Sequence, residues 1–135
     1  MADAAPAPSK RPLSPHLQVY RLTLSMLMSG LHRITGLCLV AGMMLLTWWL
    51  LAAAAGQNAY ATFEAFSTSW IGRLILFGFS WAALHHLLGG LRYLLWDLSI
   101  WIDNEEREWL IRANIVGSIV CTLLLWVILF LSGMR

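Results

Sequence analysis

The chain has 135 residues, of which 59% are hydrophobic and only 12% are charged. A soluble domain carries about a quarter charged residues, so this composition excludes an ordinary soluble fold and indicates an integral membrane protein. The formal net charge of +2 is too small to indicate nucleic-acid binding, and no nucleic-acid partner is expected.

The chain is expected to divide into an N-terminal segment, residues 1–28, and a membrane domain, residues 29–135. The segment holds all four prolines and no long apolar run, so it does not look like a signal peptide. Three stretches without any acidic or basic residue follow, at 34–63, 74–91 and 113–134. A helix needs about 20 apolar residues to cross the hydrocarbon of a bilayer. The sequence therefore predicts an all-α fold with three transmembrane helices, at about 30–55, 70–97 and 111–133.

Two connecting segments are predicted to be irregular. The stretch "GQNAYATFEAFSTS", residues 56–69, is rich in polar and turn-forming residues and is interpreted as a loop. The stretch "DNEEREW", residues 103–109, is interpreted as a solvated turn. Seven basic residues lie before or at the start of the first span or flank the connection between the second and third spans, whereas two lie on the opposite side. By the positive-inside rule, the N-terminus and this turn are predicted to be cytoplasmic.

Two adjacent histidines lie within the second predicted span, in "LHHLLGGLRYLLWD" (84–97). His86 is about 16 Å from the cytoplasmic end of the helix, at 1.5 Å per residue. An imidazole at that depth must face protein, water or a cofactor. His85 and His86 point in directions about 100° apart, so at most one of them can ligate a given iron.

The helical face of His86 also carries Gly89, Gly90, Tyr93 and Asp97, whereas His85 points toward the face of Leu88 and Arg92. The two glycines would leave a notch in which a flat macrocycle or another helix can lie close to the backbone. Two interpretations are open: His86 ligates a haem iron, or it hydrogen-bonds a neighbouring helix while the glycines permit packing. Arg92 and Asp97 are close enough to the predicted cytoplasmic surface to reach water.

A second polar cluster lies at the start of the first span, in "SGLHRITG" (29–36). Ser29, His32, Arg33 and Gly36 are three or four residues apart and are expected to share one helical face. Their donors could bind a quinone carbonyl or the propionates of a haem, because arginine pairs well with carboxylates. A structural role is also open, with Ser29 capping the helix and Arg33 extending toward lipid headgroups.

Three motifs in order, "RPLSPHLQVYR" (11–21), "SGLHRITG" and "HLLGGLRYLLWD" (86–97), resemble the large cytochrome b membrane-anchor subunits of succinate dehydrogenase, respiratory complex II. The resemblance extends from Arg11 to the end of the third span. It implies a three-helix anchor that forms a haem-bearing bundle with a second, smaller anchor subunit. Each of the two subunits would supply one axial histidine to a shared b-type haem.

The resemblance also implies roles for individual residues. His86 matches the family's axial ligand, because Gly90 and Arg92 follow at the family's spacing, and His85 does not match. Ser29 and Arg33 fall where the family binds ubiquinone, and His32 and Arg33 where it contacts the haem propionates. Many members have a histidine in place of Tyr93, which puts any propionate or proton role of that position in doubt here. No catalytic residue is implied for this chain.

The implied function is to anchor a succinate:quinone oxidoreductase and to pass electrons from succinate oxidation to ubiquinone. The implied partners are an iron–sulfur subunit and a flavoprotein subunit, so enzymatic activity belongs to the complex. The expected location is a bacterial inner membrane, with the mitochondrial inner membrane as the alternative. Two other functions remain open: the anchor of a quinol:fumarate reductase, and a structural or assembly membrane protein without a cofactor.

Overall fold

The computed structural model describes residues 21–133, which form four helices: α1 (Leu24–Ala55), α2 (Gln57–Thr68), α3 (Trp70–Asp97) and α4 (Asn104–Leu131). Within this part of the chain no strand occurs. The three long helices α1, α3 and α4 are each apolar and long enough to cross a membrane. The predicted all-α fold with three spans is therefore confirmed.

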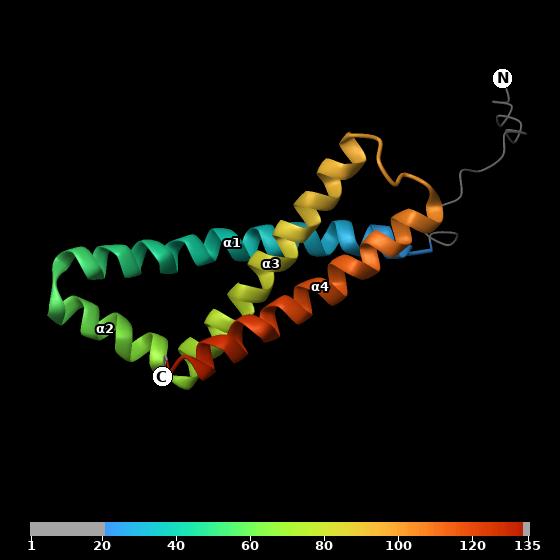
Figure 1. Cartoon of the computed structure of the whole chain (residues 1–135). Coiled ribbons are helices and arrows are strands. Elements are labelled where there is room, and N and C mark those ends of the chain that lie inside the picture. Colours follow the sequence, from blue (N-terminus) through green and yellow to red (C-terminus); the bar gives the residue numbers. More distant parts are fainter. Residues whose placement is uncertain (1–20, 134–135) are drawn as a thin grey trace, which may run out of the picture.

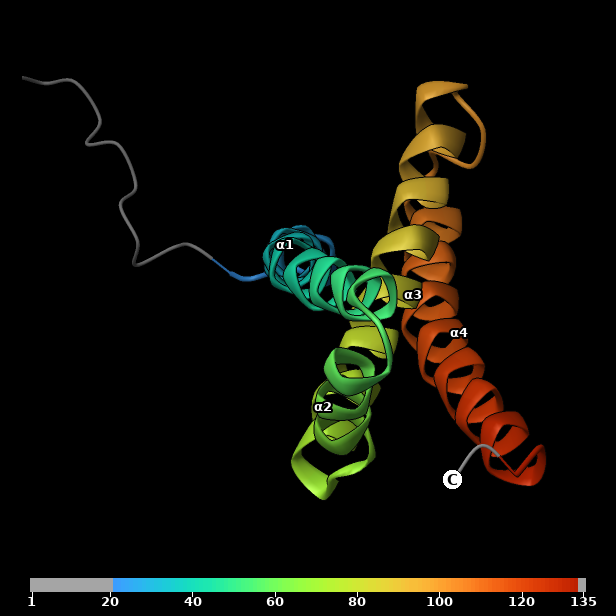
Figure 2. The same cartoon turned by 90° about the vertical axis from the view of Figure 1, so that its left-hand side faces the viewer.

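Helix α3 takes part in the two most extensive helix contacts, with α4 and with α1. Helices α3 and α4 lie side by side, and α1 crosses α3 (Figure 1). The short helix α2 leads from the end of α1 back to the start of α3. Seen from the side, α1 lies at one face of the α3–α4 pair rather than parallel to it (Figure 2).

The residues buried between the helices are mostly small or polar, whereas the large apolar side chains point outward. The buried set includes Gly42, Ala82, Gly89, Ser118 and Thr122. Lipid tails are as apolar as leucine, so helices in a bilayer gain little from burying leucine against one another. They associate instead where small residues let the backbones approach closely. This inside-out distribution is the one that a membrane protein requires.

The segment 56–69 is not the predicted loop, because residues Gln57–Thr68 form helix α2. Gly56, with φ of 105°, makes the sharp turn that reverses the chain. On α2 the rings of Phe63 and Phe66 each lie 5.1 Å from the ring of Trp48 on α1. These aromatic contacts hold the polar segment against α1, and a helix presents both rings on one side.

The segment 103–109 is also not the predicted turn. Helix α4 begins at Asn104, so most of the segment forms its first turns. Glu105 and Glu106 lie in the first turn, where negative side chains interact favourably with the helix dipole. The turn is formed instead by residues 98–103, in which Ser99 and Trp101 have positive φ angles of 58° and 56°.

Helix α1 begins at Leu24, earlier than the predicted start near residue 30. His32 is therefore not at the helix boundary but eight residues inside, or about 12 Å along the axis. Residues 24–28 of the predicted N-terminal segment are helical. Residues 1–20, which include most of the motif at 11–21, lie outside the described residues, so the cytoplasmic segment 1–28 stays a prediction.

Gly72 in the first turn of α3 generates a testable prediction. A Cβ atom at this position would lie 2.0 Å from the carbonyl oxygen of Phe66, and backbone cannot move as freely as a side chain. We expect Gly72→Ala to lower the free energy of unfolding by about 1–3 kcal/mol, the usual cost of overpacking. Thermal unfolding of the purified protein in detergent measures this change.

The control is Gly30→Ala, because no atom lies within 4 Å of the added methyl group. Equal melting temperatures for the Gly72→Ala variant and the unmodified protein would contradict the prediction.

Candidate functional site

The crossing of α1 and α3 brings two of the predicted site residues into direct contact. The imidazole Nδ1 of His86 on α3 lies 3.1 Å from the backbone carbonyl oxygen of His32 on α1, 54 positions away in the sequence. The two imidazole rings are stacked, with centroids 3.9 Å apart and planes 8° from parallel. Tyr93 adds an edge-on contact to the ring of His32 at 5.2 Å. The two motifs of the sequence therefore form one site.

The hydrogen bonds at this crossing determine which nitrogen of His86 carries the hydrogen. The Thr35 hydroxyl donates to the His32 carbonyl oxygen at 2.9 Å, and its oxygen lies 3.2 Å from Nδ1 of His86. Both atoms facing Nδ1 are therefore acceptors, so Nδ1 must be the protonated nitrogen. In a neutral ring the lone pair is then on Nε2, for which residues 21–133 supply no hydrogen-bond partner.

Two glycines allow the rings to enter the crossing. A Cβ atom on Gly36 would lie 3.2 Å from Cε1 of His86, and one on Gly89 would lie 2.6 Å from Nδ1 of His32. The notch predicted at Gly89 and Gly90 is thus half filled by His32. Nothing lies within 4 Å of a Cβ built on Gly90, so that side remains open.

The earlier start of α1 places His32 inside the helix, where its ring stacks on the ring of His86. The stacked arrangement is nevertheless unsuited to a shared metal. Two axial ligands direct ring nitrogens at the metal from opposite sides, whereas these rings lie face to face.

His85 faces α4 and is separated from the His86 site, as the helical spacing predicts. Its side chain is 1% exposed, and Nδ1 lies 3.1 Å from the Ser118 hydroxyl and 3.3 Å from the Asn114 side-chain amide. These contacts give Nδ1 of His85 polar partners inside the α3–α4 interface. A polar partner on α4 accounts for a histidine in the span without a cofactor.

Sequence reasoning missed the polar residues of the third span and one residue of the first. Asn114, Ser118 and Thr122 are all buried on α4. Their spacing of four residues within an apolar stretch is a signal that could have revealed the buried face. Thr35 lies inside the quoted motif "SGLHRITG" and was not singled out.

Arg92 is buried in the structure, whereas the sequence predicts that it can reach water. Its side chain is 3% exposed, and its guanidinium lies over the rings of Tyr93 and Trp96 at 5.1 and 4.9 Å from their centroids. The two aromatic rings cover it from water, which the position of Arg92 in the sequence does not show. Asp97, one turn after Tyr93, is exposed as predicted.

The predicted common face of the first motif is divided in the structure. His32 and Gly36 pack against α3, whereas Arg33 is exposed and Ser29 is half-buried. Adjacent residues of a helix point about 100° apart, so His32 and Arg33 cannot both face α3. Arg33 is therefore available to a group outside this chain.

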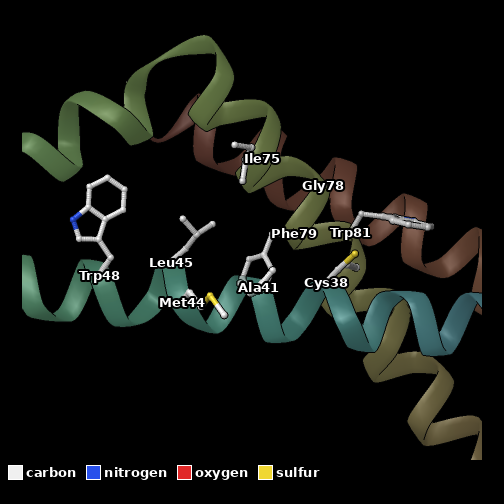
Figure 3. Close-up of a pocket in the computed structure, with 11 residues that line it drawn as sticks. Cys38, Ala41, Met44, Leu45, Trp48, Ile75, Gly78, Phe79 and Trp81 are labelled. Carbon is white, nitrogen blue, oxygen red and sulfur yellow. The ribbon is translucent and has the colours of Figure 1, made fainter.

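An apolar groove of about 760 Å³ lies between α1 and α3 (Figure 3). It begins at Ala82, one helical turn before His86, and Trp48 lines it farther along α1. The other lining residues are mostly apolar: Cys38, Ala41, Gly42, Met44, Leu45, Ile75, Gly78, Phe79 and Trp81. An apolar group can occupy this space without leaving unpaired polar atoms.

These features define a helical membrane protein with three spans and a histidine whose Nε2 is available inside the bilayer. A family model described as "Succinate dehydrogenase/Fumarate reductase transmembrane subunit" matches residues 7–132, and the chain belongs to this family. The resemblance inferred from the three motifs is therefore confirmed.

Individual relatives agree with the family match. The succinate dehydrogenase cytochrome b556 subunit of Paracoccus denitrificans is 46% identical over 120 residues, which cover 89% of this chain and 92% of the relative. The subunit of the same name from Rickettsia felis is 35% identical over 119 residues, covering 88% and 93%. The mitochondrial cytochrome b560 subunit of Sus scrofa is 37% identical over 94 residues, covering 67% and 54%.

The buried position of Ser118 generates a prediction about the α3–α4 interface. The side chain is 0% exposed and faces His85. We expect Ser118→Leu to force the two helices apart and to lower the free energy of unfolding by about 1–3 kcal/mol. Thermal unfolding in detergent measures the loss. Val116→Leu, at a 59% exposed position two residues away, is the control and should change nothing.

Proposed function

We propose that this chain is the membrane-anchor subunit of a succinate:quinone oxidoreductase, that it shares a b-type haem with a second, smaller anchor subunit, and that it contributes to a ubiquinone-reduction site. The observation that carries the proposal is the hydrogen bonding of the two ring nitrogens of His86. Its Nδ1–H is held by the His32 carbonyl and its Nε2 is free inside a membrane span. The names of the relatives, cytochrome b556 subunits, support the haem.

His86 fits the role of an axial haem ligand. A metal-binding histidine needs one nitrogen protonated and bonded to a carbonyl or carboxylate, so that the other can bind the metal. The His32 carbonyl supplies the first condition and the unpaired Nε2 the second. The open side at Gly90 and the apolar groove offer space for an apolar ring system.

The second axial ligand is proposed to come from the smaller anchor subunit. The stacking of His32 on His86 makes His32 unsuitable, and His85 is engaged with α4. His32 and Arg33 are instead proposed to lie near the haem propionates. The exposed guanidinium of Arg33 suits a carboxylate from outside the chain, because its fork of donors matches two oxygens.

A haem held by His86 would supply one-electron transfer between the soluble subunits and the quinone. This chain would orient the ligand through the hydrogen bond from Nδ1–H of His86 to the His32 carbonyl. Ubiquinone reduction takes up two electrons and two protons, so its site needs both an apolar wall and access to water. Ser29 and Arg33, in the first third of α1, are proposed to provide hydrogen-bond donors to the quinone oxygens.

The iron–sulfur and flavoprotein subunits are proposed to dock on the cytoplasmic side, where the N-terminus and the turn at 98–103 lie by the positive-inside rule. The Paracoccus and Rickettsia relatives support a bacterial inner membrane rather than a mitochondrial one. The Paracoccus, Rickettsia and Sus scrofa relatives are all named as subunits of succinate dehydrogenase. Their names favour succinate oxidation over fumarate reduction.

Substitution of the two histidines tests the haem ligand. We expect His86→Leu to abolish the b-type absorption bands of the reduced, purified complex, because leucine cannot bind iron. His85→Leu is the matched control and should retain the bands, since Nδ1 of His85 bonds to α4 and not to α1. Loss of the bands in His85→Leu with retention in His86→Leu would reverse the assignment.

Ser29→Ala and Arg33→Leu test the quinone site. A lost hydrogen bond to a charged group costs roughly 1.5–3 kcal/mol, so quinone reductase turnover should fall about ten- to a hundredfold. Electron transfer from succinate to a soluble dye should be largely retained, because it does not use the quinone site. Arg73→Leu, an exposed arginine at the opposite end of the membrane domain, is the control. If both activities fall together, Ser29 and Arg33 serve assembly and not quinone binding.

A further inference from the structure

Thr35 is a fully buried threonine whose hydroxyl takes part in the contact between α1 and α3. Its side chain is 1% exposed. Three atoms form a closed triangle: the Thr35 hydroxyl, the His32 carbonyl oxygen and Nδ1 of His86. The three sides measure 2.9, 3.1 and 3.2 Å, all within hydrogen-bond range.

The hydrogens of this triangle can be placed in only one consistent way. A carbonyl oxygen only accepts, so the Thr35 hydroxyl donates to it, and Nδ1–H of His86 is shared between the carbonyl and the Thr35 oxygen. The lone pairs of the hydroxyl then face His86. Thr35 thus adds a second acceptor to the nitrogen that the His32 carbonyl already binds.

Bonds from threonine to its own helix are common in this chain and have no special meaning by themselves. Thr47 and Thr122 donate to the carbonyls of Met43 and Ser118, each at 2.7 Å. Thr35 differs because its oxygen also lies against a ring nitrogen of another helix. A threonine that only bonds to its own helix does not need this second contact.

We propose that Thr35 is a positioning residue for His86: it fixes the ring's orientation and its Nδ1–H form, and it raises the electron density that Nε2 presents to the haem iron. This inference rests on the proposed ligation by His86. A hydrogen bond accepted from Nδ1–H makes the opposite nitrogen a stronger donor, as it does in other metal sites. A stronger donor favours the oxidised iron, so Thr35 should lower the haem reduction potential.

The test is a redox titration of the haem absorption in the assembled complex. Thr35→Val keeps the shape of the side chain and removes the hydroxyl. We expect the midpoint potential to rise, with the ratio of reduced to oxidised haem at a fixed ambient potential increasing about two- to tenfold, the effect of one hydrogen bond. Thr35→Ser should restore the original potential, because the serine hydroxyl can make the same two contacts.

The matched control is Thr122→Val, which removes a hydroxyl of equal burial from α4 and should leave the potential unchanged. An unchanged potential in Thr35→Val, or an equal shift in Thr122→Val, overturns the inference. If Thr35→Val does not assemble, Thr35→Ala makes the same test without the added methyl groups. Failure of both to assemble, with normal assembly of Thr35→Ser, would assign the hydroxyl to folding and also overturn the inference.

The His86→Leu variant separates the two proposals. Retention of the haem in that variant contradicts the proposed ligand. Loss of the haem in His86→Leu together with an unchanged potential in Thr35→Val contradicts only the role of Thr35.

Discussion

An imidazole inside a hydrocarbon layer must find a partner for its N–H within the protein, and the structure around His86 follows from that requirement. The partner is the His32 carbonyl, which belongs to a different helix. A carbonyl within a helix is reachable only where two backbones come very close. The crossing of α1 and α3 is therefore placed where Gly36 and Gly89 remove the side chains that would keep the helices apart.

The same contact links local packing to the chemistry that we propose. Satisfying Nδ1 with acceptors leaves Nε2 as the nitrogen with a lone pair, so one hydrogen-bonding arrangement both stabilises the crossing and prepares a metal ligand. His85, one residue earlier, shows the opposite outcome. Its ring is enclosed by Ser118 and Asn114 and contributes to the α3–α4 interface. Two identical side chains thus have different roles because they face different helices.

The remaining surface is what an anchor within a larger assembly would present. Large apolar side chains cover the outside of the helices, and the groove between α1 and α3 is lined mainly by apolar atoms. Helix α2 closes one end of this region, because Phe63 and Phe66 pack against Trp48. The connection between the first two spans is therefore a packed helix that helps to set the position of α3 relative to α1.

The sequence by itself determined the three spans and the separation of His85 from His86. Both depend only on local chemistry: runs without charge are long enough for a bilayer, and adjacent residues of a helix point about 100° apart. The three sequence motifs also identified the protein family. Tertiary structure decided the contacts of Thr35 and His32 with His86 and the burial of Arg92. Each depends on where one helix crosses another, or on which aromatic ring covers a charge, and neither has a local periodic signal. Helix α2 belongs to the same group, since its polar composition favours a loop until Trp48 provides a surface for its phenylalanines.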